Sequence, residues 1–244
     1  MPKGVQPTAE QVNEVKTRFL QNLAAEPPAV PFHPSDLARI KDSDVWITQL
    51  LEAYKLDVEK AIIRLRQNCE WRQSFGTNDI NETNVNQEYL NDGEIFVHNQ
   101  DKDGMPLLIV NMSKHNKNKN QEDLIRVMVY WVERIQHETN YSKKITLFMD
   151  MTDAGLGNLD LDYIKAIIGL FETKYPNAPN YIVVHDLPFL LNAAFKIVKG
   201  FMPPEALEIL KVTTKKDINE YVDKDNCLKV WGGNDDYVYK FQAK

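Results

Sequence analysis

The stretch that decides the fold spans residues 145–186 and contains two apolar runs, ITLFM at 145–149 and YIVVH at 181–185. Neither run alternates apolar with polar residues as a strand with one wet face does, so both are predicted to be strands buried within a sheet. A helix predicted at about 160–174, between them, places Leu161, Ile164, Ile168 and Phe171 on one face, and Tyr175, directly after it, continues that face. Pro176 ends this helix. A strand, a helix and a second strand in this order predict a crossover unit and a largely parallel sheet.

Two further strands are predicted upstream, at residues 94–98 and 107–110. The connection between them includes Gly104, which can adopt the positive φ that a hairpin turn requires. Residues 122–138 then have the apolar spacing of a helix. The predicted fold class is therefore α/β, with a mixed, largely parallel sheet flanked by helices.

The N-terminal part of the chain is helical in pattern. Residues 9–25 have apolar side chains at helical spacing, and the proline-rich residues 26–31 end that helix and form a linker. Further helices are predicted to begin at Val45 and near Asp57, because apolar side chains again recur at helical spacing after a polar capping residue.

The change of pattern near residue 92 predicts the domain organisation. We expect residues 1–91 to form an N-terminal helical unit with a leading helix and linker, and residues 92–244 to form the α/β domain. Within the helical unit, Ser35 or Asp36 is expected to cap a short turn.

Composition excludes several classes of protein. The chain has 244 residues, of which 43% are hydrophobic, and its net charge is −6. This length and apolar content support a folded core, and two cysteines exclude a disulfide framework. The acidic balance argues against a nucleic-acid binder. Uncharged stretches reach only about ten residues, too short to span a bilayer, so a soluble cytoplasmic protein is expected, with any membrane anchor outside this chain.

One motif suggests a nucleotide enzyme, and its details argue against that reading. Gly155 and Gly157 follow a strand and precede a helix, as in a dinucleotide-binding loop. The position of the third glycine is occupied by Asp160, whose carboxylate would repel a phosphate. An ordinary turn capped by Asp160 is the favoured interpretation.

Other candidate catalytic and metal sites have simpler explanations. Asp101 and Asp103 lack the spacing of a calcium loop, and no two histidines have a metal-binding helical spacing. Cys69 is predicted to be a core residue, and His185 a structural histidine at a strand end. Asp150, also at a strand end, is expected to cap a loop rather than to catalyse. The sequence therefore predicts neither an enzyme nor a cofactor or metal site.

The segment from 187 to 202 stands out, because it is apolar on nearly every side of a predicted helix. Only Asn192, Lys196 and Lys199 interrupt it. A surface helix normally has one apolar stripe and one polar face. Such a helix is either buried on both sides or faces an apolar partner outside the core, and the pattern alone leaves both alternatives open.

Several ordered motifs resemble the CRAL-TRIO lipid-transfer family. The later motifs are Tyr175-Pro176, His185-Asp186-Leu187-Pro188-Phe189, the stretch 192–199, and Phe201-Met202-Pro203-Pro204-Glu205-Ala206. The earlier ones are Leu56-Asp57-Val58-Glu59-Lys60-Ala61 leading to Trp71-Arg72, Asp101-Lys102-Asp103-Gly104-Met105-Pro106, and Leu147-Phe148-Met149-Asp150-Met151. The resemblance covers roughly residues 36–240.

This resemblance implies a sheet that floors a lipid-sized hydrophobic cavity and a gate helix, at about 188–202, that closes over it. Gly200, Pro203 and Pro204 are the implied hinges. The residues implied to bind lipid are Phe189, Leu191, Phe195, Val198, Phe201, Met202 and Leu207. Lys196 and Lys199 are the implied membrane-contact residues, and with Lys211, Lys215 and Lys216 they would favour an anionic surface. A solvated polar rim remains the alternative for these lysines.

One departure from the family pattern concerns the ligand. Members that bind phosphatidylinositol carry a Glu after the Tyr-Pro pair and a Lys in the short helix after the gate, where this chain has Asn177 and Ile209. The expected ligand is therefore a neutral or differently anchored lipid, a sterol or another small hydrophobe. The expected function is binding and membrane-to-membrane transfer of that lipid, with transient membrane contact. The alternative is a membrane-recruitment or scaffold module with a collapsed cavity and no lipid exchange. No protein partner is indicated.

Overall fold

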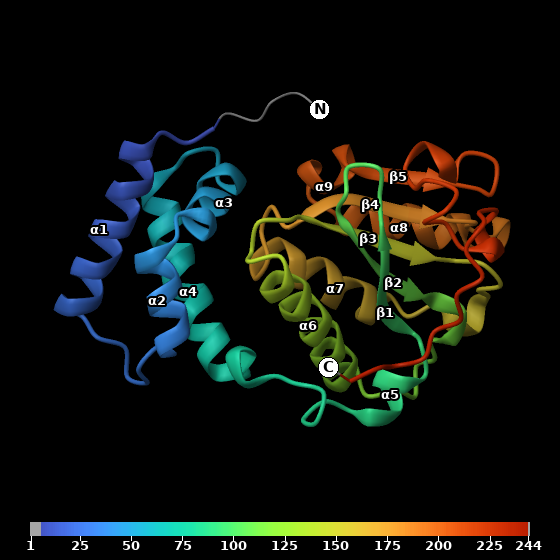
Figure 1. Cartoon of the computed structure of the whole chain (residues 1–244), viewed down its shortest axis with the longest axis horizontal. Coiled ribbons are helices and arrows are strands. Elements are labelled where there is room, and N and C mark those ends of the chain that lie inside the picture. The colour runs from blue at the N-terminus through green and yellow to red at the C-terminus, as the bar shows by residue number, and fades with distance from the viewer. Residues whose placement is uncertain (1–5, 244) are drawn as a thin grey trace. The chain divides into compact units, whose positions relative to one another are not determined.

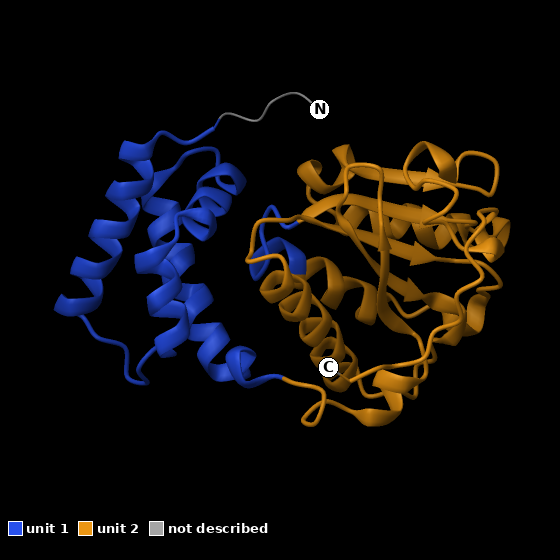
Figure 2. Cartoon of the chain, viewed as in Figure 1, with its two compact units in different colours: residues 1–80, 171–178 blue, residues 81–170, 179–244 orange. Residues whose placement is uncertain are grey.

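The computed structural model describes residues 6–243, which divide into two compact units (Figure 2). Unit 1 comprises the residues up to 80 together with 171–178, and unit 2 comprises 81–170 together with 179 onward. Residues 81–91 thus group with the sheet in the contact pattern. The expected folding boundary at residue 92 stays a prediction.

Within the described residues, unit 1 contains four complete helices around one apolar core. They are α1 (Ala9–Ala25), α2 (Pro34–Asp42), α3 (Val45–Ala53) and α4 (Val58–Phe75), followed by the 3-10 turn η1 (Thr77–Asp79). The predicted first helix is confirmed, and Thr8 forms a capping box with Gln11 at its start. Core side chains with no exposed surface include Val15, Ile40, Ile47, Leu50, Leu51, Leu65 and Cys69. Burial raises the pKa of the Cys69 thiol to about 12, as suits a core residue.

The predicted cap of α2 is wrong. The N-cap is His33, whose Nδ1 accepts a hydrogen bond from the Ser35 backbone N–H at 3.2 Å. Asp36 is instead 1% exposed and points into the unit, where Arg72 Nε donates to its Oδ1 at 2.7 Å. Asn78 Nδ2 donates to the second oxygen at 2.7 Å. The carboxylate therefore joins α2 to α4 and η1, which the local sequence around residue 35 does not reveal.

Unit 2 contains a five-stranded sheet in the order β1-β2-β3-β4-β5 (Figure 1). The strands are β1 (Ile95–Gln100), β2 (Pro106–Asn111), β3 (Ile145–Asp150), β4 (Pro179–His185) and β5 (Leu210–Thr213). β1 and β2 pair antiparallel, and every later pair is parallel. Gly104, with φ of 76°, lies in the hairpin turn. These features confirm the predicted hairpin and the mixed, largely parallel sheet. Strand β5 was not predicted, because it has four residues and two of them are polar, which is too short an apolar pattern to indicate a strand.

The remaining elements of unit 2 precede, connect or follow the strands. The helices are α5 (Gln87–Asn91), α6 (Gln121–Glu138), α7 (Leu161–Thr173, which extends into unit 1), α8 (Asn192–Phe201) and α9 (Pro204–Glu208). The 3-10 turns are η2 (Met112–Lys114), η3 (Leu156–Asn158), η4 (Phe189–Leu191), η5 (Ile218–Glu220) and η6 (Lys229–Trp231). A helix that joins two neighbouring parallel strands makes a right-handed crossover, so three such connections in one direction across the sheet put α6, α7 and α8 on the same face. The segment after β5 covers the other face, where Trp231 stacks on Phe148 of β3.

The ion pair inside unit 1 gives a stability prediction. Arg72 and Asp36 are both almost fully buried, so replacing Arg72 with Leu removes the nearest cation from a buried carboxylate, and Arg39 remains 3.8 Å away. We expect Arg72→Leu to lower the free energy of unfolding by about 3–5 kcal/mol in urea titrations. Arg18→Leu, which removes exposed pairs with Glu14 and Glu59, should cost much less, because ion pairs in contact with solvent contribute little to stability. Equal losses in the two variants would contradict this account.

Candidate functional site

One face of the sheet is closed by aromatic and polar contacts. The Trp231 ring stacks on Phe148 with centroids 4.1 Å apart, and its Nε1 donates to Asp150 Oδ2 at 2.9 Å. Trp231 and Phe148 have no exposed surface. On the same face, Tyr181 of β4 meets Tyr221 edge to face. Packing contacts with the segment after β5 therefore occupy this face of the sheet, and the candidate site is sought on the other face.

A row of polar side chains crosses the carboxyl ends of the parallel strands on that closed face. Asn111, Asp150, His185 and Thr213 are aligned by the strand register. Asp150 Oδ1 accepts from the Thr152 N–H at 3.0 Å, which is consistent with its expected capping role. His185 Nδ1 lies 3.1 Å from Thr213 Oγ1, whereas its buried Nε2 has no hydrogen-bond partner within the described residues. The row closes the strand ends rather than forming an open site.

The opposite face of the sheet, toward the helices, is covered unevenly. Side chains alternate along a strand, so the neighbours of Phe148 and His185 point to this face. Coverage decreases across the sheet from β2 to β5. Leu108 and Val110 of β2 are at most 1% exposed, Met149 and Ile182 of β3 and β4 are half-buried, and Val212 of β5 is 52% exposed. We call the partly covered apolar residues of this face the floor: Met149, Ile182, Leu210 and Val212.

The segment expected to form the gate begins as a 3-10 turn and continues as a short α-helix. Pro188 is extended, η4 follows, and α8 starts at Asn192. No residue of α8 is buried. Its half-buried side is entirely apolar and consists of Ala194, Phe195, Val198 and Phe201.

The interpretation of this helix as apolar on nearly every side is wrong in space. Asn192, Lys196 and Lys199 all lie on its exposed side, together with Ala193 and Ile197. The polar residues recur at intervals of four and three, which gathers them on one helical face. The helix thus has one apolar side toward the protein and one mixed side toward solvent.

The residues expected to bind lipid lie in different environments. Leu191 is 2% exposed and anchors η4, whereas the adjacent Phe189 is 90% exposed. Phe195, Val198, Phe201 and Met202 are half-buried, and Leu207 of α9 is 39% exposed.

The cations near this helix pack on its aromatic rings. Lys196 and Lys199 are exposed, and Lys199 Nζ lies 5.2 Å from the centre of the Phe195 ring. Lys165 Nζ of α7 lies 4.5 Å from the Phe201 ring and connects the end of α8 to α7.

The two positions that depart from the family pattern contain no charged side chain. Asn177 belongs to unit 1, where its Nδ2 donates to Glu52 Oε2 at 2.5 Å. Ile209 follows α9 and is half-buried.

The motifs that resemble enzyme or metal sites serve local structure. Asp160 Oδ1 accepts from the N–H groups of Asp162 and Tyr163 at 3.1 and 3.0 Å, so it caps α7 as predicted. Asp101 Oδ1 accepts from the Asp103 and Met105 N–H groups within the hairpin turn. Among residues 6–243, no group of three or more His, Cys, Asp or Glu side chains is placed to hold a metal ion. In the same range, no helix is long and apolar enough to cross a membrane.

Comparison with known proteins identifies a family match and a fold match. The family model described as CRAL/TRIO domain matches residues 90–233. The crystal structure of Sfh5 aligns with a TM-score of 0.70 at 13% identity, covering 95% of this chain and 90% of that one. This similarity confirms the α/β fold.

Several curated relatives are similar to this chain in sequence. A CRAL-TRIO domain-containing protein of Schizosaccharomyces pombe is 24% identical over 84% of this chain and 49% of its own length. The phosphatidylinositol transfer protein CSR1 of Eremothecium gossypii is 23% identical over 96% of this chain and 57% of its own. The SEC14 cytosolic factor of Yarrowia lipolytica is 25% identical over 70% and 39%. The chain thus spans about half the length of these relatives.

The buried histidine on the closed face gives a pH prediction. Burial lowers the pKa of His185 below the ordinary value of 6.5. The unfolded chain therefore binds more protons at this position as the pH falls below about 6.5, and stability is lost. His185→Asn, which does not titrate, should flatten the decrease in unfolding free energy between pH 7 and pH 5, measured in urea. The exposed His137→Gln serves as control and should keep the wild-type slope. An unchanged slope in His185→Asn would refute the assignment.

Proposed function

This chain belongs to the CRAL/TRIO domain family, and we propose that it binds a hydrophobic lipid and transfers it between membranes without catalysing a reaction. The observation that supports the proposal best is the partly covered floor. Met149 and Ile182 lie on the inner strands of a five-stranded sheet, where both faces of a parallel sheet are normally buried. An apolar ligand on the floor would complete that burial.

The half-buried side of α8 supports the same ligand position. Ala194, Phe195, Val198 and Phe201 present apolar surface on the side of the helix that is turned away from solvent. We infer that acyl chains or a sterol ring lie between this side and the floor. Each methylene kept from water contributes about 0.8 kcal/mol, so a two-chain lipid of about 30 methylenes would gain over 20 kcal/mol.

Release of such a ligand requires α8 to move, and its flanks suit that motion. Proline residues stand at both ends, Pro188 before η4 and Pro203 before α9, and Gly200 lies in the last turn. No side chain of α8 is fully buried, so moving the helix exposes little well-packed core. We propose that α8 is a gate that opens against a membrane.

The ligand class follows from the two uncharged positions in the family pattern. Relatives include a protein named as a phosphatidylinositol transfer protein. In this chain Asn177 and Ile209 replace the Glu and Lys of the headgroup pair, and Asn177 bonds to Glu52. We propose that this chain does not use that pair and binds a neutral or differently anchored lipid, such as a sterol.

A closer likeness within the family is also proposed. Asp44-Val45-Trp46, the stretch 192–199 and Trp231-Gly232-Gly233 are similar to the N-terminal domain of motile sperm domain-containing protein 2. Under this proposal the chain acts in the cytoplasm and associates with membranes peripherally.

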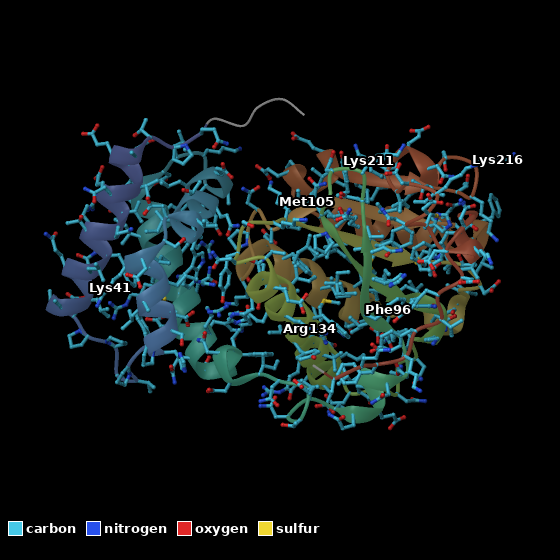
Figure 3. All side chains as sticks on the ribbon, viewed as in Figure 1. Lys41, Phe96, Met105, Arg134, Lys211 and Lys216 are labelled. Atoms are coloured by element: carbon cyan, nitrogen blue, oxygen red, sulfur yellow. The ribbon has the colours of Figure 1, made fainter. Side chains whose placement is uncertain are left out.

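Charge supports a membrane contact around α8. Residues 187–216 contain five lysines and two glutamates, a net charge of +3 within a chain of net −6. Lys196 and Lys199 are exposed on α8, and Figure 3 shows Lys211 on β5 and Lys216 beyond it. Each lysine near an anionic surface contributes about 1 kcal/mol. The exposed Phe189 and Ile197 add apolar contact.

The second candidate function is a membrane-recruitment or scaffold module that exchanges no lipid. The 90% exposure of Phe189 and the exposed lysines favour it, because they suit membrane binding whether or not a ligand is carried. In that case the cavity above the floor would be collapsed, and the protein would bind membranes without exchanging lipid.

A pair of variants on α8 tests ligand binding. Val198 lies on the apolar side and Ala193 on the exposed side, so Val198→Asp places a charge against the proposed ligand and Ala193→Asp does not. After equilibration with liposomes, native mass spectrometry should detect bound lipid in the wild type and Ala193→Asp. The Val198→Asp occupancy should be at least about tenfold lower. A wild type that takes up no lipid, or equal occupancy in the two folded variants, would contradict the proposal.

Membrane contact is tested at Phe189. Transfer of one large apolar side chain into a bilayer contributes about 1.5–3 kcal/mol, so Phe189→Asp should weaken binding to anionic liposomes by at least tenfold. Leu156, 67% exposed on η3, provides the matched control, and Leu156→Asp should bind as the wild type does. Sedimentation with vesicles measures both. Equal binding by the two variants would remove Phe189 from the contact, and binding without lipid exchange would favour the recruitment module.

A further inference from the structure

Three cationic side chains of unit 1 gather around two aromatic rings. On α4, Lys60 Nζ and Arg64 Cζ lie 4.9 and 5.4 Å from the centre of the Tyr54 ring. Lys174, from the segment 171–178, has its Nζ 5.5 Å from the Trp71 ring. The last side chain joins the other two across more than a hundred residues of sequence, so the cluster is a product of the fold. We call Lys60, Arg64 and Lys174 the cationic cluster.

Within residues 6–243, no carboxylate forms an ion pair with any member of the cationic cluster. Arg64 donates only to the neutral Gln67, at 3.2 Å. Other cations of unit 1 do have acidic partners: Arg18 of α1 pairs with Glu14 and Glu59, and Arg66 of α4 with Glu70.

The acidic residues nearby leave the cluster's charge largely uncompensated. Glu59 is held by Arg18, and the two oxygens of Glu52 accept from Gln6 and Asn177. Glu172 is the remaining acid whose field reaches Tyr54, where it helps burial to raise the pKa of the phenol. One such carboxylate does not balance three cations.

The cluster also carries repulsion that the fold must offset. Lys60 and Arg64 are like charges four residues apart on one helix, an arrangement that destabilises a helix. Burial, followed by the charge of Arg64, lowers the pKa of Lys174. An anion placed among the three groups would turn this repulsion into attraction.

A neutral donor adjoins the cluster on the same helix. Asn68 follows Arg64 by one turn of α4 and is 2% exposed. Its Nδ2 has no hydrogen-bond partner within the part of the chain that the structure describes. A buried donor without a partner is costly, and an anion would satisfy it.

We propose that Lys60, Arg64 and Lys174 form a binding site for a phosphate group. Guanidinium and ammonium donors match phosphate oxygens, with Arg64 supplying a planar fork and the lysines point charges. The same chemistry is offered by a phosphorylated lipid headgroup and by a soluble phosphate compound. The site lies wholly within unit 1 and does not rest on the proposed lipid function.

Isothermal titration with inorganic phosphate at constant ionic strength tests the site, with the full chain as the sample. The wild type should bind, and Arg64→Gln should weaken binding by at least about tenfold, because it removes a charged hydrogen-bond donor to the phosphate. Arg66→Gln, two residues away, should bind as the wild type does. NMR of the Lys174 ammonium should show its pKa rising on addition of phosphate.

Vesicles distinguish the two sources of phosphate. Sedimentation compares the binding of the wild type and Arg64→Gln to two kinds of vesicle. One is phosphatidylcholine alone, and the other is phosphatidylcholine with about 5% phosphatidic acid. Phosphatidic-acid binding that depends on Arg64 supports the site with a headgroup as its ligand. Phosphate binding that depends on Arg64 without vesicle binding supports it with a soluble compound. A wild type that binds neither probe, or binding that Arg64→Gln leaves unchanged, would overturn the proposal.

Discussion

The rest of unit 2 depends on the requirement that a largely parallel sheet be covered on both faces. One face is closed over the central strand β3: Trp231 stacks on Phe148 and donates to Asp150, and the C-terminal segment lies over the strands. On the other face, burial is complete at β2 and declines to 52% exposure at Val212 of β5. The sheet thus has one covered face, under the C-terminal segment, and one partly covered face, which bears the floor.

Partial coverage of this face explains why the apolar side of α8 is only half-buried. A helix packed directly on the floor would bury side chains such as Phe195 and Val198, yet none of α8 is buried. The floor and the helix both retain apolar surface, and a hydrophobic ligand between them would satisfy both at once. In the proposed function, the same incomplete packing lets the gate move at low cost. Binding and release then depend on one structural feature.

The sequence was sufficient for the strands and helices that have strong periodicity. The runs at 145–149 and 181–185, the hairpin at Gly104 and the cap at Asp160 all formed as expected, because each depends on local chemistry. The polar face of α8 could also have been recognised, since Asn192, Lys196 and Lys199 recur at helical spacing.

The remaining features depend on contacts between distant residues. Apolar periodicity predicts that Met149 and Ile182 face inward, but not what lies opposite them, so their partial exposure was not predictable. Asp36 was predicted to be a helix cap, because its partner Arg72 is 36 residues away in the sequence. The cationic cluster likewise required Lys174 to fold against α4.

The most direct test of the account is to detect which methionine methyl groups touch a bound lipid. Met149 on the floor and Met202 at the end of α8 are half-buried, whereas Met112 and Met128 are at most 1% exposed and lie outside the proposed site. With methyl-labelled protein and a bound lipid, NMR should show lipid contacts to Met149 and Met202 and none to Met112 or Met128. A bound lipid that shows no NMR contact to the methyl group of Met149 or Met202 would contradict the claim that the partly covered face of the sheet holds the ligand.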